Sequence, residues 1–123
     1  VSLRVDLAWL LMVADRHTPG DPDITDWGAL VAAVSRHQAE IFGVPVYTEP
    51  HTRAAALLQS LLRVPALERC NAMFATATAY AYLVASGVKV DPSPERVRDL
   101  ARLVKEDAAD LPAIAEELRT WCQ

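Results

Sequence analysis

The sequence is poor in cysteine and glycine and has no excess of positive charge. Its two cysteines, Cys70 and Cys122, are too few for a disulfide framework, and they match no metal-ligand spacing. The net charge of −4 argues against a free-standing nucleic-acid binder, because such domains are usually basic. The four glycines lie far apart, so the chain contains no glycine-rich phosphate-binding loop.

Targeting and metal-binding signals are also missing. Residues 1–6 carry no basic stretch ahead of an apolar one, so the sequence predicts no signal peptide. With thiols expected to be reduced, this indicates a cytoplasmic protein. His17, His37 and His51 are scattered, and His37 with Glu40 supplies only two ligands on one helix. A metal site needs more ligands than this, so none is expected.

The chain does have enough apolar residues to bury a core. Hydrophobic residues make up 52% of the 123 residues and charged residues 23%, which is the balance of a globular domain. No repeat, low-complexity tract or linker divides the sequence, so residues 1–123 are expected to form a single domain. Abundant alanine and leucine with little glycine favour helix throughout, which predicts an all-α fold.

Apolar periodicity and capping residues predict about six helices in a compact bundle. Their expected ranges are 6–17, 27–41, 52–62, 71–86, 93–105 and 110–121. Residues 44–48 alternate valine and tyrosine around Pro45, which predicts a short extended flap containing Val46 and Tyr47. Residues 63–69 are expected to form a loop, because Pro65 disfavours helix just before it.

The segment 71–86 is apolar on every face of a helix. Such helices lie in a protein core or in a membrane. The segment is rich in alanine and threonine and has no flanking basic clusters, which favours a buried central helix. Insertion into a membrane is the weaker alternative.

The junction between the loop and this helix is the place where chemistry is expected. A helix N-terminus presents free N–H groups and attracts anions. Arg63 and Arg69 either bind a phosphate there or form a solvated surface. Asn71 either caps the helix, which we favour, or holds a ligand. Cys70 and Glu68 are the candidate catalytic groups, although a packed thiol is the simpler interpretation of Cys70.

Three stretches in order and spacing carry a resemblance to a known family. They read "VDLAWLLMVADRH", "ITDWGALVAAVSRHQAEIFGVPVYTEPHTRAAALLQSLLR" and "LVASGVKV". They resemble the Fic/Doc family, in particular the short Doc-like toxins of toxin–antitoxin pairs. The resemblance implies a compact all-α bundle whose central helix follows an active-site loop. It also implies transfer of part of a nucleotide to a protein hydroxyl, or, for Doc-like toxins, phosphorylation of a translation factor.

The family motif is His-x-Phe-x-(Asp/Glu)-(Gly/Ala)-Asn-(Lys/Gly)-Arg, and this chain departs from it. With Asn71 as the anchor, the motif falls on residues 65–73. The position of the proton-accepting histidine is Pro65, which has no titratable group. The acidic residue that helps to hold Mg²⁺ is replaced by Arg69, which repels a cation.

The remaining motif positions are also changed. Cys70 stands where the family has a small residue, and Ala72 and Met73 stand where it has phosphate-binding cations. Only Leu67, as an apolar anchor, and Asn71 fit. Ordinary Fic/Doc activity is therefore not expected, and Mg²⁺ and ATP would be cofactors only if the site is functional after all.

Two functions remain open. The first is a degenerate Doc-like protein that binds an antitoxin-like or other protein partner, or a ligand, without catalysis. It predicts no nucleic-acid partner and no membrane association, and it is compatible with a homo-oligomer formed through an apolar surface. The alternative is an enzyme with repurposed chemistry at residues 63–71, acting on a nucleotide or a phosphate-bearing substrate.

Overall fold

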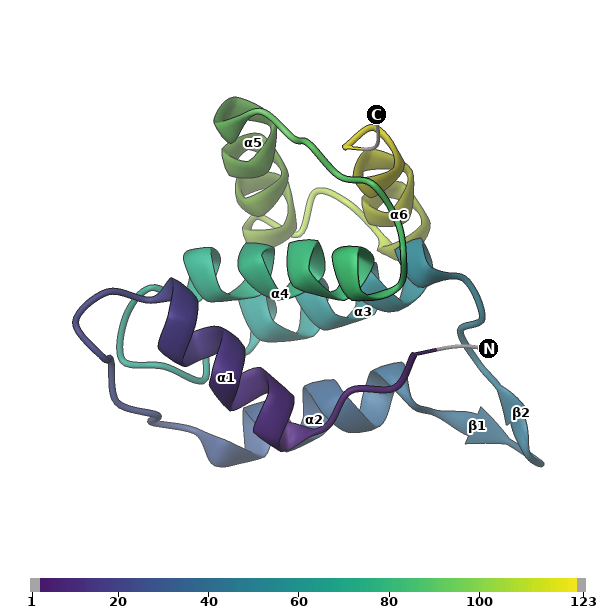
Figure 1. Cartoon of the computed structure of the whole chain (residues 1–123), viewed down its shortest axis with the longest axis horizontal. Helices are drawn as coiled ribbons and strands as arrows, with labels where there is room; N and C mark the ends of the chain where they lie inside the picture. Colours follow the sequence, from purple (N-terminus) through teal and green to yellow (C-terminus); the bar gives the residue numbers. More distant parts are fainter. Residues whose placement is uncertain (1–2, 122–123) are drawn as a thin grey trace.

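The computed structural model describes residues 3–121, and Figure 1 shows a bundle of helices with one small hairpin. The predicted all-α bundle is confirmed, with six helices in this part of the chain. The helices are α1 (Leu7–His17), α2 (Trp27–His37), α3 (Pro50–Arg63), α4 (Asn71–Ala85), α5 (Pro94–Lys105) and α6 (Leu111–Arg119). The hairpin consists of β1 (Glu40–Ile41) and β2 (Val44–Pro45).

Four helices begin at the capping residues that the sequence indicates. In each, a side-chain oxygen accepts a hydrogen bond from the backbone N–H three residues later, which satisfies one of the free donors of the first turn. These caps are Asp6 for α1, Asp26 for α2, Ser93 for α5 and Asp110 for α6, at distances of 2.9, 3.1, 3.2 and 3.0 Å.

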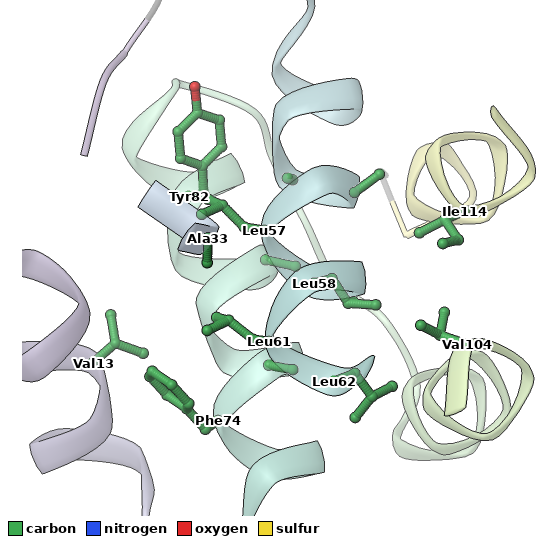
Figure 2. Packing of buried hydrophobic residues seen from close by; sticks show 14 of the residues in the cluster. Val13, Ala33, Leu57, Leu58, Leu61, Leu62, Phe74, Tyr82, Val104 and Ile114 are labelled. Carbon is green, nitrogen blue, oxygen red and sulfur yellow. The ribbon is translucent and has the colours of Figure 1, made fainter. Parts of the chain in front are cut away.

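Helices α3 and α4 share the centre of the bundle. Helix α3 packs against α2, α4, α5 and α6, and α1 packs against α4. Figure 2 shows Leu58 and Leu62 on the side of α3 that faces Val104 and Ile114. Burial of these four side chains joins α3 to α5 and α6 within the common core.

Helix α4 is less enclosed than its sequence predicts. Phe74, Ala75 and Leu83 are buried, but the side chains of Met73 and Val84 remain about half exposed, at 48% and 50%. The continuous apolar run therefore combines a core face with a second apolar face that the described residues leave uncovered. No helix within residues 3–121 has the length and apolar character needed to cross a membrane.

The prediction for the end of the second helix is wrong by four residues. Helix α2 ends at His37, and Glu40–Ile41 pairs antiparallel with Val44–Pro45. Phe42 and Gly43 make the turn with φ of +51° and +79°, as expected for a two-residue hairpin. The Phe42-Gly43 pair was the signal for this turn in the sequence. The residues before it are compatible with a helix, so the helix was predicted to continue. The extended flap is present, but it begins at residue 40 rather than 44.

Candidate functional site

Residues 64–70, which we call the motif loop, connect α3 to α4 and lie against the segment 19–26. Leu67 forms an isolated antiparallel bridge with Ile24. The carbonyl of Ala66 accepts hydrogen bonds from the backbone N–H groups of Thr25 and Asp26, at 2.8 and 3.1 Å. Ala66 and Leu67 are buried, as expected for an apolar anchor at position 67. The two segments thus fix the backbone of the motif loop.

Asn71 holds the loop from the other side, and its predicted role as the cap of α4 is wrong. It is the first residue of the helix, and Cys70 occupies the cap position. The Asn71 Oδ1 accepts hydrogen bonds from the backbone N–H groups of Ala66 and Leu67, at 3.2 and 3.0 Å. Its Nδ2 donates to the carbonyl of Leu67 at 2.8 Å. Because Asn71 lies one position inside the helix, its side chain bonds to the preceding loop and not to the free N–H groups of α4.

Cys70 has an uncommon backbone conformation. Its φ is +65°, in the left-handed region where glycine is favoured, and its thiol is half-buried. The side chain makes no capping hydrogen bond to α4. The family pattern has glycine or alanine at this position, and the positive φ gives a physical reason for the glycine.

The side chains of Glu68 and Arg69 bind each other and the neighbouring loop. Arg69 Nη1 lies 2.6 Å from Glu68 Oε1, and its Nη2 donates to the carbonyl of Gly20 at 2.7 Å. Glu68 Oε1 also accepts from the backbone N–H of Asp23 at 3.1 Å. Both candidate residues are thus part of the connection between the motif loop and residues 19–23.

Arg63 and Arg69 have different partners. Arg63 forms an exposed ion pair of 2.7 Å with Asp107, in the turn after α5. It also lines a groove of about 420 Å³ between α2 and α3, together with Arg36 and Val64. Arg36 Nη1 donates to Ser60 Oγ in this groove at 3.1 Å. The two cations of the α2–α3 groove are therefore Arg36 and Arg63, and sequence reasoning did not single out Arg36.

The predicted flap residues lie at the opposite end of α3 from the motif loop (Figure 1). Helix α3 has 14 residues and so separates the two by roughly 20 Å. Val46 continues the hairpin through a 2.9 Å hydrogen bond from its N–H to the carbonyl of Ala39. The Tyr47 ring lies beside the Arg36 guanidinium, 5.9 Å from the ring centroid.

The histidines occupy unrelated environments. His37 is fully buried, accepts a hydrogen bond from Val5 N–H at Nε2 (3.0 Å), and donates from Nδ1 to the Val34 carbonyl (2.7 Å). Burial lowers the pKa of His37, which keeps the ring neutral. Burial and the charge of Arg119 lower the pKa of His51. Within residues 3–121, no three His, Cys, Asp or Glu side chains gather as a metal site would need.

A second surface, which we call the α4 groove, follows the uncovered face of α4. It consists of three adjoining hollows of about 510, 430 and 270 Å³. The first two share Met73 and Thr76, and the second and third share His17 and Tyr80. Helix α5 and Trp121 border one part of the groove, and α1 borders the rest. Sequence reasoning missed this surface, although apolar residues at 73, 77, 80 and 84 have the spacing of one helix face.

A helical bundle with a loop and central helix at this point in the chain is the architecture that the Fic/Doc resemblance implies, and a comparison with known proteins supports it. No protein-family model matches the chain. A curated relative, "Toxin Doc" of Mycolicibacterium smegmatis (strain ATCC 700084 / mc(2)155), is 42% identical over 101 residues. The match covers 80% of this chain and 78% of the relative. The chain therefore belongs to the Doc family of toxins.

Proposed function

We propose that this chain is a cytoplasmic, non-catalytic member of the Doc family that binds a protein partner through the α4 groove. The partner in this proposal is an antitoxin-like protein that contributes an amphipathic helix. The uncovered apolar face of α4 is the observation that carries the proposal.

The state of the motif loop supports the absence of transferase activity. Pro65 stands at the position of the general base, and loss of such a base typically lowers a rate by about 10²- to 10⁴-fold. Asn71, Glu68 and Arg69 all make hydrogen bonds within the fold. Their polar groups are already used to hold the loop against residues 19–26.

The surface of the α4 groove supports a helical occupant. Met73, Tyr80 and Val84 are 41% to 50% exposed and follow one another at helical spacing, so they form a continuous apolar strip. Helix α4 has 15 residues and offers about 22 Å of groove, which is enough for four turns of a partner helix. Exposed apolar surfaces of this kind are typical of interaction sites.

Charge supports an acidic partner. The basic residues that line the groove are Arg16, His17 and Arg98, and no aspartate or glutamate lines it. Trp121, which also lines the groove, is 1% exposed, and its Nε1 has no acceptor within residues 3–121. The partner is therefore expected to combine an apolar stripe with glutamate or aspartate.

The proposal is tested by co-expression with an antitoxin of a Doc-type toxin–antitoxin pair. We expect the two proteins to co-purify in a fixed ratio, and Met73→Glu to abolish this because it buries a negative charge against an acidic helix. Val31→Glu is the matched control, since Val31 is 51% exposed on α2 and lines none of the three hollows. Equal retention of the partner by both variants would contradict the proposal.

The α2–α3 groove favours the alternative function, an enzyme with repurposed chemistry. Arg36 and Arg63 line a volume of about 420 Å³ that reaches the motif loop at Val64, and two guanidinium groups are suited to a phosphate. Incubation with labelled ATP, Mg²⁺ and cell lysate tests it. Label transfer that is lost in Glu68→Ala or Cys70→Ala would establish the alternative, and absence of transfer supports the non-catalytic function.

A further inference from the structure

A separate pocket lies where the N-terminal segment meets the start of α3 and the end of α4. Its volume is about 410 Å³, within the range of small-molecule sites. We call it the Arg53 pocket. Its lining residues are Leu3, Arg4, Thr48, Pro50, Arg53, Tyr82, Ala85 and Ser86. They include two arginines and no acidic residue, so the pocket is electropositive.

Arg53 is the central feature of this pocket. It is 1% exposed, yet no carboxylate within residues 3–121 pairs with it. Its Nε donates to the carbonyl of Tyr47 at 2.7 Å, and its Nη1 donates to the carbonyl of Leu3 at 3.1 Å. A guanidinium has five N–H groups, and among residues 3–121 only these two carbonyls accept from Arg53. A buried charge without a counter-ion is costly, and an anion in the pocket would offset that cost.

Ser86 is a second, independent indication of a ligand. Its Oγ is buried and has no hydrogen-bond partner within residues 3–121. Ser86 follows the last residue of α4, whereas Arg53 belongs to the first turn of α3. Two different elements thus present unused polar groups to the same pocket. Buried polar groups are nearly always satisfied, so each such exception needs an explanation.

The remaining lining restricts the kind of anion. Arg4 is already paired with Glu40 at the surface, so Arg53 is the cation available to a ligand. Tyr82 uses its hydroxyl to donate to the carbonyl of Leu3 at 2.5 Å. Leu3, Pro50 and Ala85 add apolar walls. A planar carboxylate matches a guanidinium in a bidentate manner, and a short apolar tail matches the walls.

We infer that the Arg53 pocket binds a carboxylate with a short apolar tail, held by Arg53 and Ser86. A free aliphatic acid and the C-terminus of a peptide present the same chemistry. This site is distinct from the α4 groove, and its existence does not depend on the function proposed above.

The test is an NMR titration of the whole chain with butanoate, with acetyl-Ala-Val, with its C-terminal amide, and with inorganic phosphate. We expect saturable binding of butanoate, of acetyl-Ala-Val, or of both. Stronger binding of butanoate indicates a free acid as the ligand, and stronger binding of acetyl-Ala-Val indicates a peptide C-terminus. The neutral amide is expected not to bind. Binding of the amide as strong as that of the acid, binding of phosphate alone, or no saturable binding of any probe would overturn the inference.

Variants locate the site. Arg53→Lys keeps the positive charge but not the bidentate geometry, so affinity for the carboxylate is expected to fall about tenfold or more. Ser86→Ala removes a single unpartnered hydroxyl, leaves the free protein folded, and is expected to weaken binding severalfold. Arg102→Ala, on the exposed face of α5, is the control and should bind normally. Unchanged affinity in both single variants, Ser86→Ala and Arg53→Lys, would also overturn the inference.

Discussion

The motif loop leads into α4 and the α4 groove follows that helix, but the two regions differ in how their functional groups are used. At the motif loop, the side chains of Glu68, Arg69 and Asn71 are bonded to neighbouring backbone groups. Along the groove, Met73 and Val84 remain exposed, and the Trp121 Nε1 has no acceptor within residues 3–121. The first region has the features of a structural connection, and the second has those of an interface. In the structure, the residues at the position of the family motif connect the motif loop to the neighbouring segments.

Among substitutions that affect the motif loop, Asn71→Ala should be the most damaging. It removes three hydrogen bonds and leaves two backbone N–H groups of the motif loop without acceptors. We expect a loss of about 3 kcal/mol in the free energy of unfolding, measured by urea denaturation. Asn71→Asp keeps the acceptor and should lose only about 1 kcal/mol. Equal stability of Asn71→Ala and the wild type would show that the loop is not held in this way.

Acidification should weaken the fold through His37. Because burial lowers the pKa of His37 in the folded state, the unfolded state binds more protons at mildly acidic pH. Stability is therefore complete above the ordinary pKa of about 6.5 and declines as the pH falls below it. Protonation would also place an N–H at Nε2 against the N–H of Val5.

The measurement is the free energy of unfolding between pH 7.5 and pH 5. His37→Gln should flatten the dependence of stability on pH. The pKa of His51 is also lowered, so His51→Gln should flatten it too, but less, because His51 is only partly buried. A profile that is identical in His37→Gln and in the wild type would refute this assignment.

A pair of glycine variants separates backbone strain from the Arg69 contact. Gly20 and Gly43 have similar φ values of +76° and +79°, so alanine at either position should cost about 1 kcal/mol. A Cβ at Gly20 would also overlap the Arg69 guanidinium, whereas Gly43 faces open space. Gly20→Ala should therefore be worse than Gly43→Ala in thermal unfolding by less than about 1 kcal/mol, because the flexible end of Arg69 can move but loses its hydrogen bond to Gly20. Equal losses would mean that Arg69 contributes nothing to the motif loop.

The smallest effect is expected for the ion pair between Arg63 and Asp107. Both side chains are substantially exposed, so the pair should contribute less than about 1 kcal/mol. Arg63→Ala should leave the denaturation midpoint nearly unchanged and reduce its salt dependence. A large loss of stability would indicate that Arg63, like Asn71, holds the motif loop in place.

Local signals predicted much of this fold. Asp26, Ser93 and Asp110 marked helix starts because their caps depend on adjacent backbone groups. Gly87, with φ of +86°, follows the C-cap of α4, at a position where glycine is common. The family resemblance was confirmed by the Toxin Doc relative.

Other features depend on tertiary contacts that no local pattern contains. The predicted end of α2 was wrong because the segment after His37 forms a hairpin instead of extending the helix. The role of Asn71 was missed because its partners, Ala66 and Leu67, lie in a preceding loop whose path is set by residues 19–26. The burial of Arg53 was likewise hidden, because its acceptors come from Tyr47 and Leu3.

The most direct test compares one variant from each region in the same binding assay. The dissociation constant of an antitoxin of the Doc type is measured for wild type, Met73→Glu and the loop variant Arg69→Ala. The account predicts at least about 30-fold weaker binding for Met73→Glu, as for a central interface residue, and unchanged binding for Arg69→Ala. Loss of binding in Arg69→Ala with normal binding in Met73→Glu would contradict it.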